Sequence, residues 1–132
     1  MPKTALIVED EIFVALDLER ILVDAGYTVG AIAADSAQAL AAAPACSFAF
    51  VDVNLRDGPT GPIVAERISR DYGVKVVFVT ANPGQIGAVP DALGYVRKPF
   101  SDQAILAAAA IAAAGNDASV ADADFVRLDQ RD

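Results

Sequence analysis

The sequence predicts an α/β fold with a doubly wound parallel sheet, and three features of the chain indicate it. Five short apolar runs along the chain are followed by stretches that are helical in all but one case, which is typical of consecutive strand–helix–strand units. The apolar runs are almost uninterrupted, as in strands that are buried on both faces. Polar residues follow several of these runs, at the carboxyl ends of strands, where open parallel sheets bind their ligands.

The composition restricts the classes of function. The chain has 132 residues, 55% hydrophobic and 21% charged, which fits one globular domain. Its net charge of −8 disfavours nucleic-acid binding. The absence of histidine excludes that residue as metal ligand, general base or phosphohistidine donor. The lone Cys46 cannot form an internal disulfide, which fits a reducing cytoplasm. No signal peptide is expected at the N-terminus. No membrane span is expected either, because the longest apolar run, 104–114, is shorter than the roughly 20 residues that a span needs.

The elements follow from local patterns. Strands are expected over residues 5–8, 27–32, 48–51, 74–79 and 93–96. Helices are expected over residues 11–25, 36–43, 62–72 and about 102–114. Gly26 and Gly73 follow helix ends, whereas Asp35 or Ser36 and Ser101 or Asp102 are candidate N-caps.

Two segments depart from this regular pattern. Seventeen residues, 81–97, separate Thr80 from Lys98, and the prolines and glycines among them disfavour a regular fourth helix. Residues 115–132 carry five aspartates and two arginines and are expected to form an acidic tail. Phe125, Val126 and Leu128 in this tail could pack back on the domain.

Polar side chains at four strand ends are expected to meet at one edge of the sheet. They are Glu9, Asp10, Asp52, Thr80 and Lys98. Two neighbouring aspartates repel each other unless a cation lies between them, and oxygen ligands without histidine or cysteine favour Mg²⁺. A lysine ammonium and a threonine hydroxyl can bind phosphoryl oxygens, and a carboxylate can attack phosphorus to form an aspartyl phosphate.

These residues stand in motifs that resemble the response-regulator receiver family (CheY-like). The motifs are Leu-Ile-Val-Glu9-Asp10-Glu, Val-Asp52-Val-Asn54-Leu, Val-Thr80-Ala81 and Lys98-Pro99-Phe. Each motif alone is weak, but together and in this order they are specific. The resemblance covers about residues 3–114 and implies a flavodoxin-like five-stranded sheet of order 2-1-3-4-5. It also implies a receiver domain over residues 1–114 that precedes the acidic tail, 115–132.

The resemblance implies a role for each motif residue. It implies Asp52 as phosphoacceptor; Glu9, Asp10, Asp52 and Asn54 at the Mg²⁺ site; Thr80, Ala81 and Lys98 as phosphoryl-binding residues; and Thr80 and Tyr95 as switch residues. In this family the proline after the lysine commonly follows a cis peptide bond.

The family's activity is two-component signal transduction. The resemblance implies that a histidine kinase or a histidine phosphotransferase donates the phosphoryl group, and that the output is contact with another protein, without nucleic acid or membrane. Such a protein is a regulator and not an enzyme in the sense of turnover, although its own site catalyses phosphotransfer and later hydrolysis. Residues 52–63 and the short fourth-helix region are similar to stand-alone regulators that serve HWE-type histidine kinases.

The first helix carries a second candidate surface. Ile12, Leu16 and Val23 fall near the face opposite the core stripe, so they are expected to be exposed. In receivers this helix commonly meets the kinase, which makes these residues a candidate docking patch. The alternative is that they are scattered surface apolar residues.

Two other functions remain open. One is a receiver-like scaffold that binds partners without phosphorylation. The other is a phosphatase of the haloacid dehalogenase type, in which the nucleophile usually follows the first strand in an Asp-x-Asp pattern. Here Asp52-Val-Asn54 follows the third strand, which disfavours that class.

Overall fold

The structure is a computed structural model that describes residues 3–89, 91–114 and 125–127. The strands are β1 (Thr4–Val8), β2 (Thr28–Ala33), β3 (Phe48–Val51), β4 (Lys75–Thr80), β5 (Ala92–Arg97) and β6 (Phe125–Arg127). The α-helices are α1 (Ile12–Asp24), α2 (Ser36–Ala42), α3 (Gly61–Tyr72) and α4 (Asp102–Ala114), and two 3₁₀ turns are η1 (Ala43–Ala45) and η2 (Pro83–Gln85). Within this part of the chain no helix is both long and apolar enough to cross a bilayer.

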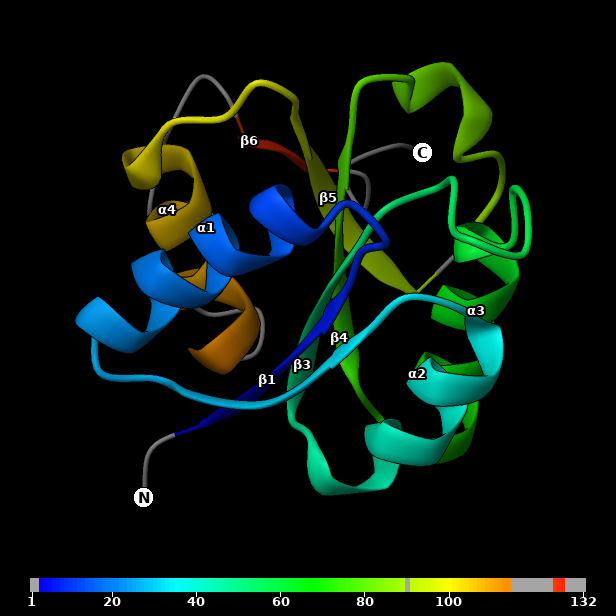
Figure 1. Ribbon diagram of the computed structural model, residues 1–132, viewed down its shortest axis with the longest axis horizontal. Helices are drawn as coiled ribbons and strands as arrows, with labels where there is room; N and C mark the ends of the chain where they lie inside the picture. Colours follow the sequence, from blue (N-terminus) through cyan, green and yellow to red (C-terminus); the bar gives the residue numbers. More distant parts are fainter. Residues whose placement is uncertain (1–2, 90, 115–124, 128–132) are drawn as a thin grey trace.

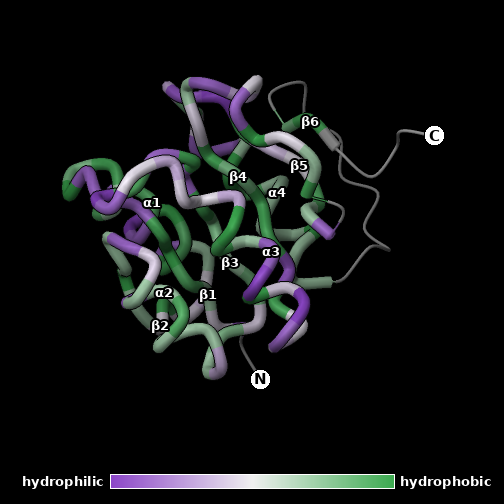
Figure 2. Tube along the Cα trace, turned by 90° about the vertical axis from the view of Figure 1, so that its right-hand side faces the viewer, coloured by the Kyte–Doolittle hydropathy of each residue, from purple (hydrophilic) through white to green (hydrophobic). Residues whose placement is uncertain are grey.

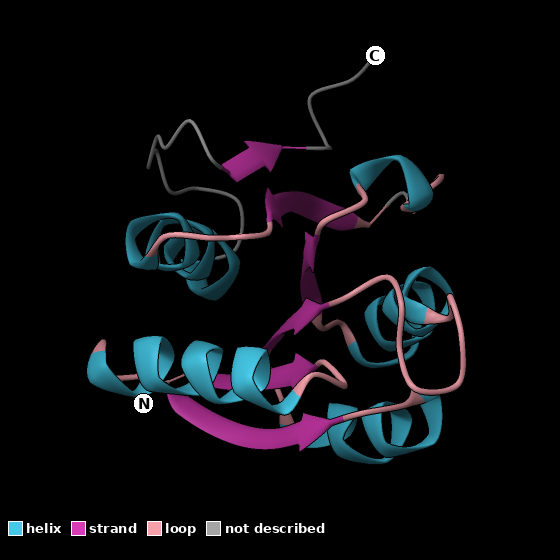
Figure 3. Ribbon diagram, turned by 45° about the horizontal axis from the view of Figure 1, so that its top comes forward, coloured by secondary structure: helices cyan, strands magenta, loops and turns pink. Residues whose placement is uncertain are grey.

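The strands form one sheet in the order β2-β1-β3-β4-β5-β6. The first five are parallel, which confirms the predicted doubly wound fold and its order 2-1-3-4-5. Figure 1 and Figure 3 show α1 and α4 on one face of the sheet and α2 and α3 on the other. Strand order reverses between β1 and β3, so their carboxyl ends border the crevice where such folds bind ligands.

Each face of the sheet covers its own apolar core. The core under α1 and α4 includes Phe48 and Phe50, whose rings stack edge to face at 6.1 Å, with Tyr27 a further 5.4 Å from Phe48. The core under α2 and α3 includes Leu6, Phe78 and other residues whose side chains alternate with the first set along the strands. Figure 2 shows the hydrophobic strands running through the interior between more polar connections.

Local signals place the helix ends close to the predicted positions. Asp35 caps α2 by accepting a hydrogen bond from the backbone N–H of Gln38, and Ser101 caps α4 by accepting one from Ala104. Gly73 ends α3 with a φ of 70°, a left-handed conformation that glycine adopts without steric cost. Element boundaries differ from the sequence prediction only at the terminal residues, where helices and strands fray.

The segment between β4 and β5 contains no α-helix in the part of it that the structure describes, as the sequence predicted. It forms the short turn η2, and its apolar residues Ile86 and Val89 are buried in the core beside α3. Proline and glycine prevent a regular helix here, so the chain covers this part of the sheet with individual side chains instead.

The sheet has a sixth strand that the sequence analysis did not predict. β6 pairs antiparallel with β5, with Phe125 opposite Val96 and Val126 opposite Tyr95. Phe125 is only 7% exposed and joins the core under α1 and α4. The sequence raised the packing of Phe125 on the domain as a possibility, but three residues are too few to show a strand periodicity, so the strand itself is identified only by its tertiary pairing. Leu128 lies outside the described residues.

Candidate functional site

The carboxyl ends of four strands bring the site residues together. Backbone hydrogen bonds continue the sheet one step beyond its strands: Glu9 N–H donates to Ala33 at 2.8 Å, and Asp52 N–H to Val8 at 2.9 Å. The N–H of Lys98 donates to the carbonyl of Thr80 at 3.0 Å in the same way. The backbone under each functional side chain is therefore fixed by the sheet rather than by a free loop.

Lys98 joins two acidic residues from different strands. Its Nζ lies 2.8 Å from Oε1 of Glu9 and 3.0 Å from Oδ2 of Asp52. Glu9 is 2% exposed and Asp52 is 8% exposed, so these ion pairs are shielded from water. The Lys98–Pro99 peptide bond is cis, as the resemblance to the receiver family implied.

Burial sets the protonation behaviour of this cluster. Burial raises the pKa of Glu9, an effect that the bonds with Lys98 and with the N–H of Glu11 only partly offset. For Lys98, burial by itself lowers the pKa, but the ion pairs with Glu9 and Asp52 outweigh it, so the pKa rises overall. The lysine is therefore positively charged at neutral pH.

Three carboxylates at the site fit a metal ion. Glu9, Asp10 and Asp52 each offer an oxygen, and these oxygens lie within 4.8 Å of one another. Asp10 is exposed at the mouth, whereas Oε1 of Glu9 is buried and makes no hydrogen bond of acceptable geometry within the described structure, despite the nearby ammonium. A set of oxygen donors with net negative charge suits a hard divalent cation such as Mg²⁺.

Asp52 is held in one orientation by its own backbone and by the start of α3. Its Oδ1 accepts a 2.7 Å hydrogen bond from the N–H of Val53. Gly61, the first residue of α3, donates to the carbonyl of Val53, and a Cβ at this glycine would lie 2.0 Å from the carbonyl oxygen of Asp52. Only glycine permits so close an approach. The sequence analysis did not single out Gly61.

A polar cavity of about 470 Å³ opens above Asp52. Its lining residues are Asp10, Glu11, Asp52, Asn54, Thr80, Ala81, Asn82 and Lys98. Thr80 is fully buried, and its hydroxyl oxygen accepts a 3.0 Å hydrogen bond from the N–H of Asn82. Every predicted metal-binding and phosphoryl-binding residue except the buried Glu9 lines this cavity, and Glu9 reaches it through Lys98.

The loop after Asp52 is tied to the start of α2. Arg56 pairs with Asp35, and Asp57 accepts hydrogen bonds from the hydroxyls of Ser36 and Thr60 at 2.6 and 2.8 Å. These contacts hold the loop beside the cavity. The contacts of Arg56 with Asp35 and of Ser36 with Asp57 join residues 21 apart in the sequence, and no sequence signal identified them.

Tyr95 lies outside the cavity, on β5. Its side chain is half-buried against the core under α2 and α3, and its backbone pairs with Val126 of β6. Of the predicted metal-binding, phosphoryl-binding and switch residues, it is therefore the one that lies within a strand and away from the cavity.

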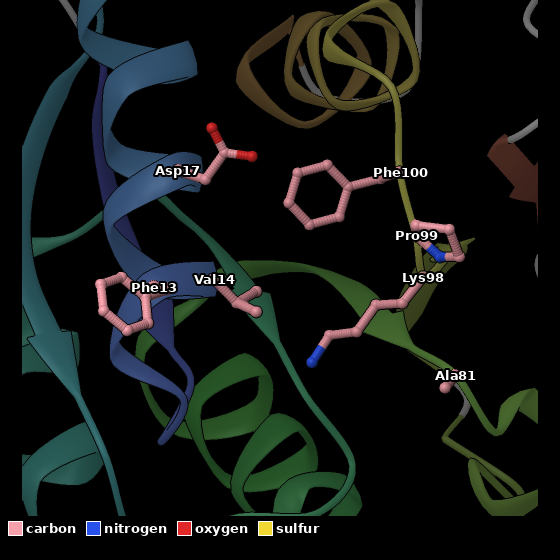
Figure 4. Close-up of a pocket in the computed structure, with 7 residues that line it drawn as sticks. All are labelled: Phe13, Val14, Asp17, Ala81, Lys98, Pro99 and Phe100. Carbon is pink, nitrogen blue, oxygen red and sulfur yellow. The ribbon is translucent and has the colours of Figure 1, made fainter.

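An apolar groove of about 460 Å³ lies beside the polar cavity, between α1 and the start of α4. It is lined by Phe13, Val14, Asp17, Ala81, Lys98, Pro99 and Phe100. Figure 4 shows Val14 and Asp17 of α1 across from Phe100 and Lys98. Because Ala81 and Lys98 also line the polar cavity, the groove leads directly to Asp52.

Further apolar side chains of α1 are exposed outside this groove. Ile12, Leu16 and Val23 are 57%, 45% and 52% exposed, so the prediction that they face away from the core is correct. Phe13 is 84% exposed and lies near the same outward face of α1, but the sequence analysis did not name it. Of these four exposed residues, Phe13 is the one that lines the groove beside the polar cavity.

Comparison with known proteins agrees with this fold and site. A model of the response regulator receiver domain matches residues 5–110. The chain belongs to that family, a class of two-component signalling domains in which an acidic cluster such as Glu9, Asp10 and Asp52 is typical of the Mg²⁺ and phosphoacceptor site.

Particular relatives include receivers from proteins named PhyR. The phyllosphere-induced regulator PhyR of Methylorubrum extorquens is 30% identical over 105 residues, which are 76% of this chain. The match spans only 39% of that regulator's length. The receiver domain of PhyR from Erythrobacter litoralis superposes with a TM-score of 0.79 at 27% identity, covering 92% of this chain and 97% of that one.

Two further structures extend the comparison. The anti-anti-sigma factor PhyR of Bartonella quintana is 25% identical with a TM-score of 0.68, and the match covers 77% of this chain and 44% of that one. A CheY-like receiver from Methanospirillum hungatei, at 24% identity and a TM-score of 0.70 over 83% of this chain and 92% of that one, shares the fold.

Proposed function

We propose that Asp52 accepts a phosphoryl group from a phosphohistidine of a histidine kinase or a histidine phosphotransferase in the cytoplasm. An oxygen of the Asp52 carboxylate forms the new bond to phosphorus while the phosphorus–nitrogen bond of the donor breaks. The imidazole that leaves takes up a proton. The protein then signals, relays or drains the phosphoryl group by contact with another protein.

The observation that carries this proposal is that the Asp52 carboxylate lies next to a cation, Lys98, and next to two further carboxylates, Glu9 and Asp10. Lys98 lies 3.0 Å from Asp52, and Asp10 lies in the same oxygen cluster at the mouth of the cavity. Phosphoryl transfer depends mainly on positioning and on neutralising the charge of the transferred group. The cavity above Asp52 supplies both.

Each lining residue has a proposed part in this chemistry. Glu9, Asp10, Asp52 and the backbone carbonyl of Asn54 would hold Mg²⁺, which neutralises phosphoryl charge when bound. Lys98 moves from its carboxylate partners to one phosphoryl oxygen, and the Thr80 hydroxyl donates to another. Ala81, which is small, leaves the approach to Asp52 open. The hydrogen bond that Thr80 accepts from Asn82 leaves its own proton free to donate.

Thr80 and Tyr95 are the proposed switch between the two states. Thr80 ends β4, and Tyr95 lies on the neighbouring β5. Movement of the Thr80 hydroxyl toward a phosphoryl group can therefore change the packing around Tyr95 on the paired strand. The surface that reports the change differs from that of a regular receiver. The turn η2 stands where a fourth helix would be, and β6 covers the edge of β5.

The groove beside the cavity is the proposed docking site for the phosphodonor. It leads to Asp52, and Ile12, Leu16, Val23 and Phe13 supply exposed apolar contacts on α1. A donor helix seated there would place its phosphohistidine at the cavity mouth.

The direct test is incubation with Mg²⁺ and acetyl phosphate, followed by intact mass measurement. The wild-type chain should gain one phosphoryl group, and Asp52→Asn should gain none. Asp24→Asn, an exposed aspartate at the end of α1, is the matched control and should behave as wild type. Phosphorylation that persists in Asp52→Asn would refute the proposal.

A further inference from the structure

A hydrogen bond between two side-chain amides crosses the rim of the phosphorylation cavity. The Nδ2 of Asn54, two residues after Asp52, donates to Oε1 of Gln85 at 3.0 Å. Asn54 lines the cavity, whereas Gln85 is the last residue of η2, on the far side of the strand pair β3–β4. None of the family motifs contains Gln85, and the chemistry described above does not use it.

The turn η2 holds Gln85 in place. The N–H of Gln85 donates to the carbonyl of Asn82 at 3.0 Å, and the N–H of Ile86 donates to Pro83 at 3.1 Å. Ile86 is buried in the core beside α3 and anchors the end of the turn. Because the backbone of Gln85 is fixed, forming the bond to Asn54 costs less conformational entropy than a bond between two free surface side chains.

The bridge completes a continuous rim around part of the cavity. From Thr80 the rim runs through Asn82, whose N–H bonds back to the Thr80 hydroxyl, and along η2 to Gln85. The amide bridge then crosses to Asn54 and so returns to the strand that carries Asp52. The bond itself is exposed to solvent, and Asn54, its donor, lines the cavity together with Asp52.

We propose that Gln85 is a positioning residue that holds the Asn54 amide across the cavity mouth and thereby slows hydrolysis of the phosphorylated protein. This inference rests on the proposed phosphorylation of Asp52. In hydrolysis the oxygen of a water molecule bonds to phosphorus, the bond from phosphorus to the Asp52 oxygen breaks, and the water's proton leaves with the phosphate or to solvent. The bridged amides restrict the positions that this water can occupy.

The test measures phosphoryl lifetime in full-length chains. Each variant is phosphorylated with acetyl phosphate and Mg²⁺, the donor is removed, and the decay of the phosphorylated mass is followed. Gln85→Met keeps the side-chain bulk without the acceptor oxygen. Its half-life should fall roughly 2- to 10-fold, the rate equivalent of one net hydrogen bond. Gln103→Ala, an exposed glutamine on α4, is the matched control and should not change the half-life.

A double-mutant cycle separates positioning from general destabilisation. In an Asn54→Ala background, Gln85→Met should have no further effect, because the group that Gln85 positions is already absent. An unchanged or longer half-life in Gln85→Met, or the same fold-change in both backgrounds, would overturn the inference while leaving phosphorylation of Asp52 intact. A wild-type chain that takes up no phosphoryl group would overturn the proposed function and this inference with it.

Discussion

The ammonium nitrogen of Lys98 lies 3.0 Å from Oδ2 of Asp52, while the other oxygen of that carboxylate is held by the N–H of Val53 at 2.7 Å. Both oxygens of Asp52 therefore have a defined partner before any phosphoryl group arrives. The same ammonium also contacts buried Glu9. One lysine thus orients the proposed nucleophile and compensates a second, buried negative charge, and the effects of changing these residues can be predicted separately.

Replacing Lys98 should slow phosphorylation much more than it changes the fold. Lys98→Met removes the cation that neutralises the transferred phosphoryl group, and loss of one such electrostatic contact costs roughly 100-fold in rate. The measurement is the rate of phosphoryl incorporation from acetyl phosphate at saturating Mg²⁺. Lys75→Met, an exposed lysine at the opposite end of β4, should retain the wild-type rate. Equal rates in both variants would exclude a phosphoryl-binding role for Lys98.

The raised pKa of Glu9 predicts a pH-dependent difference between the wild type and Glu9→Gln. Because burial raises this pKa above its usual 4.5, the folded protein holds the proton more tightly than the unfolded chain does. The stabilisation from this tighter proton binding is fully present at pH values below the pKa of Glu9 in the unfolded chain. It is lost as pH rises through the pKa of Glu9 in the folded protein. Glu9→Gln stays neutral throughout.

The free energy of unfolding of Glu9→Gln, relative to wild type, should therefore increase from about pH 4 to pH 7. Urea titrations in the presence of a chelator measure this difference. Added Mg²⁺ should shrink it, because a bound cation stabilises the ionised carboxylate. A difference that stays constant over this pH range would show that burial does not govern the titration of Glu9.

Gly61→Ala should destabilise the protein and displace the phosphoacceptor. The added Cβ would lie 2.0 Å from the carbonyl oxygen of Asp52 and 2.7 Å from Cα of Val53, so backbone must move. Overpacking against backbone is expected to cost about 3 kcal/mol. Gly84→Ala, whose Cβ would meet nothing within 4 Å, should cost less than about 0.5 kcal/mol. Chemical denaturation of the two variants is the measurement, and similar costs would contradict the close packing at Gly61.

Phe125→Ala should destabilise the whole domain, because β6 contributes Phe125 to the core under α1 and α4. Truncation of a buried phenylalanine at a sheet edge is expected to cost about 2–4 kcal/mol in the free energy of unfolding. Its neighbour Val126 is 40% exposed, and Val126→Ala should cost less than about 1 kcal/mol. A thermal midpoint for Phe125→Ala that equals the wild-type value would mean that β6 adds nothing to the fold.

Phe13→Ser should slow phosphorylation by a donor protein but not phosphorylation by a small-molecule donor. If the groove beside α1 receives the donor protein, loss of this exposed ring should slow transfer from a phosphohistidine protein roughly 10-fold, the cost of removing one interface anchor. Phosphorylation by acetyl phosphate, which needs no docking, should stay at the wild-type rate. Ile63→Ser on α3, with 62% exposure on the other face of the sheet, is the matched control. Equal effects of Phe13→Ser on both donors would contradict docking at this groove.

The sequence by itself determined the five parallel strands, the four α-helices and the lack of a regular helix among the described residues between β4 and β5, whereas the strand order came from the resemblance to the receiver family. These features depend on apolar runs, helical periodicity, and proline and glycine placed in short stretches of chain, so local patterns contain them. The convergence of Asp10, Asp52, Thr80 and Lys98 also followed from sequence, because the carboxyl ends of neighbouring parallel strands must meet at one edge of the sheet.

Only the tertiary structure revealed the contacts between segments that show neither a hydrophobic periodicity nor a sequence motif. Phe125 enters the core through three residues of an acidic segment, Gly61 packs on the backbone of Asp52, and Gln85 reaches Asn54 across the cavity rim. Each of these depends on the distance between backbones that are remote in sequence. That distance is set by the packing of the complete sheet and its helices, and residue type and spacing along the chain do not encode it.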